Sequence, residues 1–296
     1  MTDFSDLGLS APTLQAVAET GYTVATPIQA EAIPVALSGR DVLGIAQTGT
    51  GKTAAFTLPI LDRLRPHANT SFSPARHPVL ALILVPTREL AMQVDESVRT
   101  YGRTVPLRST VVYGGVPMEP QIKALRDGVE ILVATPGRLL DLVGQRVANL
   151  GQVEILVLDE ADRMLDMGFL PDIQRIIGLL PAKRQNLMFS ATFSDDIRRL
   201  SRTILRDPDE VEVAPRNIAA EAVKQVYYPV DPDRKEELLA HLIRTQDLRQ
   251  VLVFTRTKIA ATRLASWLDR QGLDAVAIHS GATRSIRRTG VPASRR

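Results

Sequence analysis

Short apolar runs alternate with amphipathic, helix-like stretches along most of this chain. The apolar runs have the length and composition of strands that are buried on both faces of a parallel sheet. They are Val42–Ala46, Val79–Val85, Ser109–Tyr113, Ile131–Ala134, Ile155–Leu158 and Asn186–Phe189. Stretches with helical spacing of apolar residues lie between them, for example Arg88–Tyr101, Glu119–Arg126 and Ile197–Leu205. The alternation predicts an α/β fold, with an open, mostly parallel, doubly wound sheet and helices on both faces.

A second α/β unit is predicted after a break that contains prolines. The segment Asp207–Glu221 is acidic at first and includes Pro208 and Pro215, which favours an exit strand followed by a linker. Strands and helices then alternate again, as Gln225–Val230, Arg234–Thr245, Gln250–Phe254, Ile259–Gln271 and Ala275–His279. We therefore expect a first domain over residues 1–210, a linker over 211–222, a partial second domain over 223–281 and a disordered, arginine-rich tail over 282–296.

Composition narrows the class of protein. The chain has 296 residues and no cysteine, so disulfide partners and thiol chemistry are excluded. No apolar run approaches the ~18 residues that a membrane-spanning helix requires. The N-terminal stretch MTDFSDLGLS is acidic and lacks an apolar centre, so we expect no signal peptide and a cytoplasmic protein.

The net charge is a poor guide to nucleic-acid binding here. The chain carries +3 at pH 7 and has a pI of about 9.3. Five arginines and no acid lie within the last thirteen residues, namely Arg284, Arg287, Arg288, Arg295 and Arg296. Removing these five charges from +3 leaves −2 for residues 1–283. Evidence for a nucleic-acid partner must therefore come from motifs rather than from bulk charge.

The most informative motif, AQTGTGKT, lies between a predicted strand and a predicted helix. Its residues are Ala46, Gln47, Thr48, Gly49, Thr50, Gly51, Lys52 and Thr53. A glycine-rich turn at such a place directs backbone N–H groups and a helix N-terminus at one point, which favours a phosphate. Lys52 would reach the β- and γ-phosphates of a nucleotide, and the Thr53 hydroxyl would bind Mg²⁺. Ala46 departs from the strict motif, which begins with glycine, and the alternative is a helix start with a surface lysine.

An acidic motif directly follows the predicted strand Ile155–Leu158. Asp159 lies at the carboxyl end of that strand, where it would hold a nucleotide-bound Mg²⁺ directly or through water. Glu160, one residue further on, would orient or deprotonate the attacking water. The alternative is an acidic turn that starts a helix, since Asp and Glu favour the first helical turn.

Two further motifs have an ordinary structural explanation beside a functional one. Ser190-Ala191-Thr192 ends a predicted strand, where Ser and Thr commonly cap the next helix. The functional interpretation is a hydroxyl pair that links the metal site to a neighbouring surface. Thr26 to Gln29 forms a helix capping box with proline at the first helical position. The functional interpretation is that the Gln29 amide, with one donor and one acceptor group, reads an adenine edge.

Asp159-Glu160-Ala161-Asp162 is the signature that names the DEAD-box RNA helicases, and residues 1–281 resemble that family in motif order and spacing. The other similar motifs are a Q motif within residues 2–30 (Phe4 and Gly21–Gln29), Ala46–Thr53, Pro86–Ala91, Gly114-Gly115, Thr135–Arg138, Ser190–Thr192 and Val251–Thr257. Ala25 replaces the usual proline of the Q motif. The run Arg163–Phe169 is most similar to the bacterial RhlE-type branch.

The resemblance implies two RecA-like P-loop NTPase domains, the second one incomplete, and an ATP-dependent RNA helicase that uses ATP and Mg²⁺. It assigns Phe4 and Gln29 to adenine recognition, and Asp162, Ser190 and Thr192 to the coupling of hydrolysis with local unwinding. It assigns contacts with the RNA backbone to Pro86, Thr87, Arg88, Gly114, Gly115, Thr135, Gly137 and Arg138. Such contacts position RNA but read little of its sequence. Family members serve ribosome assembly or RNA decay, and the partners of this chain are open at this point.

The second predicted domain departs from the family. Only 74 residues run from Val223 to Arg296, Arg284 stands where the family has glutamine, and the late motifs with the arginine fingers are missing. An arginine finger contributes roughly 10³–10⁵ in rate to phosphoryl transfer. We therefore expect a truncated or frameshifted sequence in which residues 1–210 fold well and residues 223–281 are marginal. The alternative function is a remnant that binds ATP and RNA weakly without efficient coupled hydrolysis. A GTPase is a weak third option, because no Asn-Lys-x-Asp motif is present.

Overall fold

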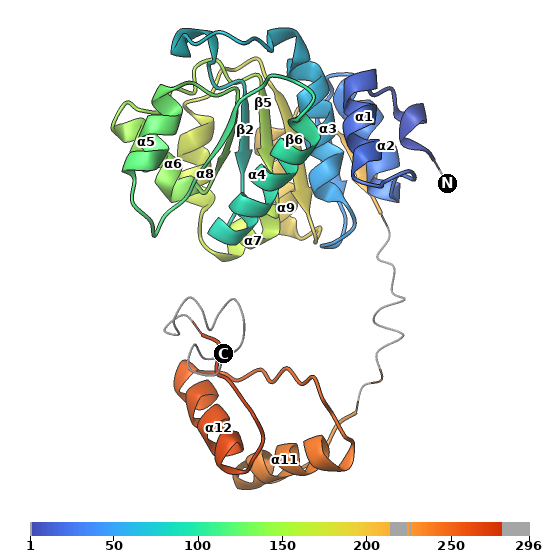
Figure 1. The fold of residues 1–296 in the computed structure, drawn as a ribbon, viewed down its shortest axis with the longest axis vertical. Helices are drawn as coiled ribbons and strands as arrows, with labels where there is room; N and C mark the ends of the chain where they lie inside the picture. Colours follow the sequence, from blue (N-terminus) through green and yellow to red (C-terminus); the bar gives the residue numbers. More distant parts are fainter. Residues whose placement is uncertain (1, 214–223, 225, 280–296) are drawn as a thin grey trace. The chain divides into compact units, whose positions relative to one another are not determined.

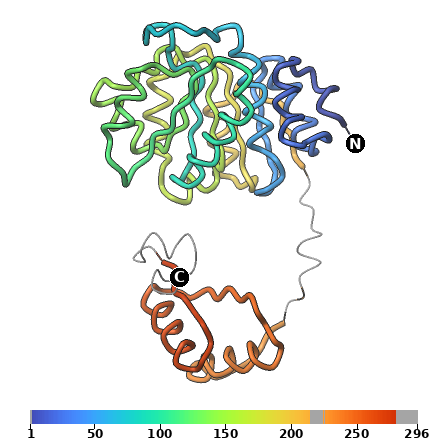
Figure 2. The backbone as a smooth tube through the Cα atoms, viewed as in Figure 1, coloured from blue at the N-terminus to red at the C-terminus, as the bar shows by residue number. Residues whose placement is uncertain are grey.

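The computed structural model describes residues 2–213, 224 and 226–279 (Figure 1). The chain divides into two compact units, residues 1–216 and residues 217–296. The backbone trace shows closely stacked layers in the first unit and two helices joined by extended chain in the second (Figure 2). Among the residues described, no helix combines the length and the apolar character needed to cross a membrane. The predicted tail and most of the predicted linker lie outside the described residues.

A seven-stranded sheet organises the first unit. Its strands are β1 (Val42–Ile45), β2 (Ala81–Leu84), β3 (Ser109–Val112), β4 (Ile131–Ala134), β5 (Ile155–Leu158), β6 (Gln185–Ser190) and β7 (Asp209–Glu212). They lie in the order β3-β4-β2-β5-β6-β1-β7, and every neighbouring pair is parallel. Five of the six predicted apolar runs contain one strand each, the sixth (Asn186–Phe189) lies within β6, and β7 falls within the predicted exit segment. The predicted open, parallel α/β sheet is therefore confirmed.

Helices cover both faces of this sheet (Figure 1). The α-helices of the first unit are α1 (Ala11–Glu19), α2 (Pro27–Leu37), α3 (Lys52–Leu64), α4 (Arg88–Gly102), α5 (Glu119–Arg126), α6 (Pro136–Gly144), α7 (Ala161–Asp166), α8 (Leu170–Ile177) and α9 (Asp195–Ile204). Short 3₁₀ turns are η1 (Phe4–Leu7), η2 (Arg65–His67) and η3 (Pro74–Arg76). The strand–helix alternation expected from the sequence is thus realised as a layered α/β/α unit.

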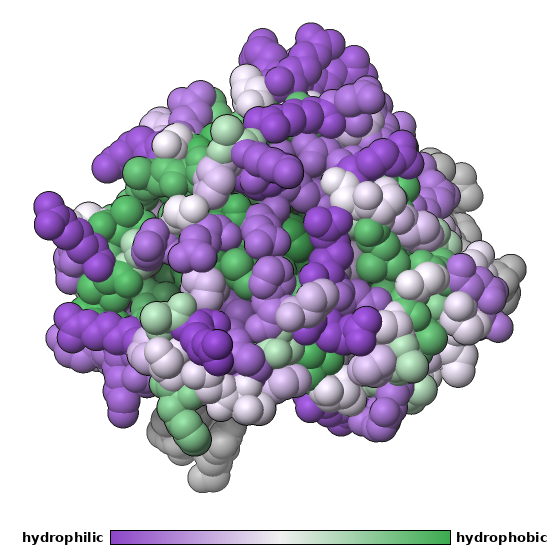
Figure 3. Space-filling model, turned by 90° about the horizontal axis from the view of Figure 1, so that it is seen from above, coloured by the Kyte–Doolittle hydropathy of each residue, from purple (hydrophilic) through white to green (hydrophobic). Residues whose placement is uncertain are grey.

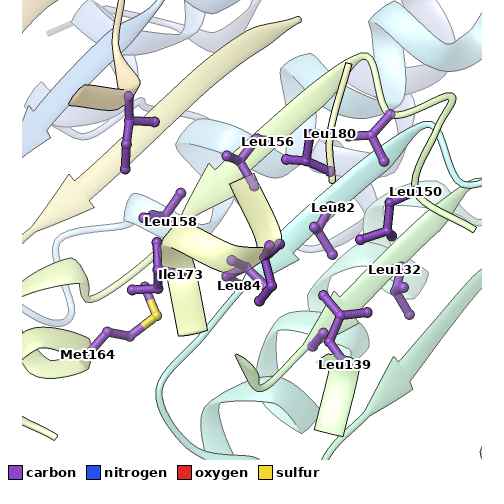
Figure 4. Close-up of a cluster of buried hydrophobic side chains, with 14 of the residues drawn as sticks. Leu82, Leu84, Leu132, Leu139, Leu150, Leu156, Leu158, Met164, Ile173 and Leu180 are labelled. Carbon is purple, nitrogen blue, oxygen red and sulfur yellow. The ribbon is translucent and has the colours of Figure 1, made fainter. Parts of the chain in front are cut away.

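Two hydrophobic cores lie on opposite faces of the sheet, because successive strand residues point in opposite directions. Along β5, Leu156 and Leu158 enter a leucine-rich core with α5 to α9, part of which is shown in Figure 4. Ile155 and Val157 enter the other core, with α2, α3 and α4. These two covered faces explain why the strands read as continuous apolar runs rather than as alternating ones.

Gly44 in β1 shows how tightly the second core is packed. It pairs in register with Phe189 of β6, and an added Cβ at Gly44 would lie 2.6 Å from the Phe189 ring. The same ring packs against Phe56 of α3 with 5.5 Å between centroids. The absence of a side chain at Gly44 therefore makes room for the aromatic pair that joins α3 to the sheet.

The amino ends of the strands meet at one edge, where buried polar groups bind one another. Asp41, directly before β1, accepts hydrogen bonds from the Asn186 amide N–H (2.7 Å), the Asn186 side chain (2.9 Å) and the Arg206 backbone N–H (2.8 Å). Glu130, directly before β4, pairs with His77 Nδ1 at 2.5 Å, and neither side chain is exposed. The carboxyl ends of the strands form the opposite edge, which carries the predicted motifs.

The second unit contains helices but no strand among its described residues. Its helical elements are η4 (Pro232–Arg234), α11 (Lys235–Thr245) and α12 (Lys258–Arg270). The segments predicted as strands have no sheet pairing within the described residues. Apolar side chains that a packed sheet would bury are exposed instead, including Tyr227 (87 %) and Phe254 (88 %). A strand is stable only with a paired neighbour, so the local apolar pattern alone was insufficient.

Candidate functional site

A cavity of about 460 Å³ opens at the carboxyl edge of the first unit's sheet. Its walls combine three regions that are distant in sequence: the N-terminal segment, the turn after β1, and the acidic turn after β5. Their predicted site residues in the wall are Phe4, Gln29, Thr48, Gly49, Gly51, Lys52, Thr53, Asp159 and Glu160. Parallel strands bring these turns to one edge, as is usual for ligand sites in open α/β sheets.

The turn after β1 adopts a backbone conformation that requires glycine at two positions. Gly49 and Gly51 have φ of +83° and +96°, which is the left-handed region that side chains disfavour. Helix α3 begins immediately afterwards at Lys52. The Lys52 side chain is buried, and its Nζ donates a hydrogen bond to the Ala46 carbonyl at 2.6 Å. The lysine therefore spans the turn from its last residues back to its first, rather than lying on the surface.

Gln29 joins helix α2 to this turn. Its Oε1 accepts a hydrogen bond from the Thr26 backbone N–H at 3.0 Å, which is one arm of the predicted capping box. Its Nε2 donates to the Gly51 carbonyl at 3.1 Å. A Cβ at Gly51 would collide with the Gln29 amide, so glycine is needed there for this close approach as well as for its φ. The capping prediction and the location beside the turn are thus both realised in one side chain.

Phe4 reaches the same cavity from the start of the chain. It lies in η1 and is buried with Leu7, Ala54 and Leu58 in a small hydrophobic cluster on α3. The backbone near it is held by a hydrogen bond from the Ala25 N–H to the Thr2 carbonyl at 2.9 Å. The structure therefore brings Phe4 and Gln29 together, although the sequence separates them widely.

Asp159 and Glu160 directly follow β5 and differ in burial and in backbone conformation. Asp159 is buried, and this burial raises the pKa of its carboxyl group to about 6, with Lys52 acting in the opposite direction and Glu160 in the same one. Glu160 has φ of +50°, an uncommon left-handed conformation for a residue with a side chain. Its Oε2 accepts a hydrogen bond from Arg163 Nη1 at 3.0 Å. A strained residue beside a buried carboxylate is typical of a functional site.

The predicted coupling residues link three neighbouring turns. Asp162 Oδ2 accepts a hydrogen bond from the Ala191 N–H at 3.2 Å, which connects the acidic turn to the turn after β6. The Ser190 carbonyl accepts from the Ala46 N–H at 3.0 Å, which connects it to the turn after β1. The Ser190 hydroxyl accepts from the Thr192 N–H at 3.3 Å. Hydrogen bonds therefore join the turns after β1, β5 and β6.

The residues predicted to contact RNA lie on the same edge, after β2, β3 and β4. Thr87 caps α4 by accepting from the Leu90 N–H at 3.3 Å, and Arg88 lies over the Tyr113 ring at 5.2 Å. Arg138 of α6 donates to the Val116 carbonyl at 3.1 Å. The remaining predicted residues are Pro86, Gly114, Gly115, Thr135 and Gly137.

Several nitrogens at this edge have no partner among the residues that the structure describes. Arg138 Nε and Nη1 and Arg88 Nε are buried there without a hydrogen-bond acceptor. An added Cβ at Gly114, Gly115 or Gly137 would meet no atom within 4 Å, so the chain leaves the space above these glycines open. Unpaired guanidinium donors beside an open backbone surface are suited to an anionic ligand.

The comparison with protein families decides the classification. Residues 26–200 match the family model described as DEAD/DEAH box helicase. The chain belongs to this family. The seven-stranded sheet is accordingly the RecA-like domain of a DEAD-box protein, as the predicted fold class stated.

Curated relatives and a solved structure agree with this assignment. The chain is 43 % identical over 276 residues to the DEAD-box ATP-dependent RNA helicase CshA of Streptococcus pneumoniae serotype 4, covering 93 % of this chain and 51 % of the relative. It is 39 % identical over 290 residues to RhpA of Helicobacter pylori, covering 98 % and 57 %. A crystal structure of a DEAD box protein from Methanococcus jannaschii matches with a TM-score of 0.65 and 34 % identity, covering 98 % and 76 %. This DEAD-box chain spans about half the length of the curated relatives it matches.

Some residues of the site were not found from the sequence. Tyr22 and Tyr101 also line the cavity, and burial, followed by Tyr22, raises the pKa of the Tyr101 hydroxyl. Asp62 of α3 accepts hydrogen bonds from the Ser10 N–H at 2.7 Å and the Thr13 hydroxyl at 2.5 Å, which ties α1 to α3. Tyr22 lies within the predicted Q motif but was not singled out as a site residue, and no local pattern marks Tyr101. The sequence shows Ser10 as a possible N-cap of α1, but it does not show that Asp62, 52 residues further along the chain, is its partner.

Proposed function

We propose that this chain supplies the ATP-binding and RNA-binding machinery of a DEAD-box ATP-dependent RNA helicase. The observation that carries the proposal is the single cavity lined by Gln29, Lys52, Thr53 and Asp159. Adenine, phosphate and metal chemistry would meet there in one place. The run Arg163–Phe169 supports a finer placement in the RhlE-like branch.

Nucleotide binding would use the residues that already surround the cavity. Lys52 exchanges the Ala46 carbonyl for the β- and γ-phosphates, while the N–H groups of residues 47–53 surround them. Each Gln29 amide atom uses one hydrogen bond within the chain, so one donor and one acceptor remain for the adenine edge. Phe4 supplies an apolar surface for the base.

The available donors fit Mg²⁺. The Thr53 hydroxyl and the Asp159 carboxylate both lie in the cavity wall. Within residues 2–213, 224 and 226–279, no group of three or more His, Cys, Asp or Glu could hold a metal alone. Mg²⁺ commonly binds one or two carboxylates and takes its other ligands from phosphates and water. When bound, Mg²⁺ would neutralise the charge that develops on the transferring phosphate.

Hydrolysis requires a base that positions water, and Glu160 is the candidate. It adjoins Asp159 in the cavity wall, and its carboxylate is held by Arg163 in this structure. As a general base it would take a proton from the attacking water. Asp162, Ser190 and Thr192 would then report phosphate loss to the neighbouring turns through their hydrogen bonds.

RNA would lie along the edge formed by the turns after β2, β3 and β4. The unpaired nitrogens of Arg88 and Arg138 support this location, since phosphate oxygens would supply the missing acceptors. Pro86, Thr87, Gly114, Gly115, Thr135 and Gly137 complete the surface. Contacts of this kind fix the position of RNA without reading its sequence.

A second candidate function follows from the second unit. Its exposed apolar side chains and its lack of described strands favour a chain that binds ATP and RNA without efficient turnover on its own. RNA-stimulated ATP hydrolysis separates the two candidates. Hydrolysis that rises strongly with RNA supports the helicase, and ATP binding without such a rise supports the second candidate.

The binding proposal is tested with Lys52→Ala and a matched control, Lys123→Ala, which removes an exposed lysine of α5. Lys52→Ala should abolish binding of a fluorescent ATP analogue, and Lys123→Ala should leave it unchanged. Glu160→Gln should retain ATP binding but lose hydrolysis. Unchanged ATP binding by Lys52→Ala would contradict the proposed site.

A further inference from the structure

The connection between α3 and β2 has an unusual distribution of charge. No acidic residue occurs between Asp62 and Glu89, whereas Arg65, His67 and Arg76 lie in this connection with exposed side chains. Within the described part of the chain, the guanidinium groups of Arg65 and Arg76 form no ion pair. His67 approaches one acid, Glu154, at 3.8 Å. We call residues 65–76 the basic loop.

The basic loop is held firmly at its centre. The Ser71 carbonyl accepts hydrogen bonds from His77 Nε2 at 2.8 Å and from Arg108 Nη2 at 2.6 Å. The Ser71 N–H donates to Asn69 Oδ1, and the Ser73 N–H donates to the Ser71 hydroxyl, both at 3.1 Å. His77 is itself fixed by the buried Glu130. Hydrogen bonds therefore hold the backbone on both sides of residue 72.

Phe72, between these two fixed serines, is 96 % exposed. In contrast, Phe189 of β6, Phe56 of α3 and Phe4 of the cavity wall are almost completely buried. Single exposed apolar residues are common on protein surfaces. Phe72 is in addition aromatic, has hydrogen-bonded serines on both sides, and lies in a loop whose two arginines form no ion pair among the described residues.

The basic loop lies at the amino edge of the sheet, away from the candidate RNA edge. It precedes β2, whose other end leads to Thr87 and Arg88. It forms the connection at the top of the first unit in Figure 1, and α7 and the acidic turn lie at the bottom. The view from above shows many hydrophilic side chains on this face, interspersed with several apolar areas (Figure 3).

We propose that the basic loop is a second binding site for single-stranded RNA. An unpaired base stacks on the Phe72 ring, and the phosphates on either side contact Arg65 and Arg76. Stacking on an aromatic ring beside cationic side chains is the general chemistry of single-strand binding, and it tolerates any base. An acidic peptide would satisfy the arginines but would not use the exposed ring. The inference rests on the proposed function, because it takes RNA as the ligand.

The test measures affinity for a fluorescent single-stranded RNA of about 16 nucleotides, the upper end of common single-strand site sizes. Phe72→Ala should weaken binding by roughly 5- to 160-fold, since one stacked base contributes about 1–3 kcal/mol. Thr70→Ala, an exposed neighbour in the same loop, is the matched control and should bind like the original chain. Phe72→Trp should restore binding, because tryptophan retains an aromatic face. Arg76→Ala should reduce the dependence of affinity on salt.

The variant Arg138→Ala separates this inference from the proposed function. Loss of affinity in Arg138→Ala with equal binding by Phe72→Ala and Thr70→Ala overturns the second site and leaves the first. Absence of RNA binding by the original chain overturns both. A poly-glutamate peptide that binds the original chain but not Phe72→Ala, with RNA binding unchanged, would identify the loop as a protein-docking site instead and also overturn the inference.

Discussion

The two edges of the sheet differ in how completely their buried charged side chains are paired. At the amino edge, Asp41 receives three hydrogen bonds, and Glu130 is paired with His77. At the carboxyl edge, Asp159 is buried with a raised pKa, and Arg138 has nitrogens without acceptors. Buried polar groups that lack partners cost stability, whereas paired ones do not. The carboxylates of Asp41 and Glu130 at the amino edge are thus paired within the chain, although Gln185 Oε1 at that edge is also buried without a partner among the described residues, whereas the Arg138 guanidinium at the carboxyl edge keeps unused donors.

The largest expected effect is at the amino edge. Glu130→Gln should lower the free energy of unfolding by about 3–5 kcal/mol, because it leaves the buried His77 without its carboxylate partner. The measurement is equilibrium denaturation in urea. Glu154→Gln, at the same edge but half exposed, is the control and should change stability by less than about 0.5 kcal/mol. Equal effects of the two variants would show that the buried pair has no special role.

Asp41→Asn should be the next largest effect at the amino edge. The asparagine NH₂ group would face donors from Asn186 or Arg206, so at least one buried donor loses its acceptor. We expect a loss of about 2–4 kcal/mol in the free energy of unfolding. Asp127→Asn, an exposed acid in the turn before β4, should leave the unfolding midpoint unchanged.

The same Asp-to-Asn substitution at the carboxyl edge should raise the free energy of unfolding instead of lowering it. Asp159→Asn removes a buried carboxylate whose pKa is raised from 3.8 to about 6, so it should stabilise the ligand-free chain by about 1–3 kcal/mol at pH 8. The cost of ionisation is fully present above pH 6 and absent below pH 4, so this gain should disappear as the pH falls through that window. In the proposed function, this substitution should also abolish ATP hydrolysis at every pH. A stability gain that does not depend on pH would refute the electrostatic cause, and Asp166→Asn is the exposed control.

Arg138→Ala should show the smallest effect on stability. Its Nε and Nη1 have no partners to lose, and its one hydrogen bond goes to the Val116 carbonyl, so a change within about 0.5 kcal/mol is expected. RNA affinity should nevertheless fall, and its salt dependence should weaken by about 0.7 in logarithmic slope. Arg126→Ala, in an exposed position of α5, should change neither quantity. Substantial unfolding of Arg138→Ala would remove the contrast between the edges.

The sequence was sufficient for the strands of the first unit and for the approximate place of the site. The six apolar runs each became a strand because both faces of this parallel sheet are covered, so local composition matched the final environment. Placing the motif turns after strands also followed, since parallel strands share one carboxyl edge. The order of the strands, with β1 between β6 and β7, has no local signature.

The features that were missed depend on contacts between distant segments. The Gln29 bond to Gly51, the Asp62 bonds to Ser10 and Thr13, and the pairing of His77 with Glu130 each join separate elements. In the second unit the local pattern was present, but the predicted strands have no described neighbour to pair with. Local sequence therefore indicated which residues favour strands, and tertiary pairing decided which of them formed one.

The hydrogen bond from Lys52 to the Ala46 carbonyl also bears on nucleotide selection. In the proposed function, any nucleotide that engages Lys52 must first replace this 2.6 Å bond. A triphosphate would offer the Lys52 ammonium group several charged acceptors in place of the Ala46 carbonyl. A monophosphate would leave Lys52 bound to that carbonyl. A hydrogen bond to a charged group is worth about 1.5–3 kcal/mol, so the resting contact would favour ATP over AMP before the second unit takes any part.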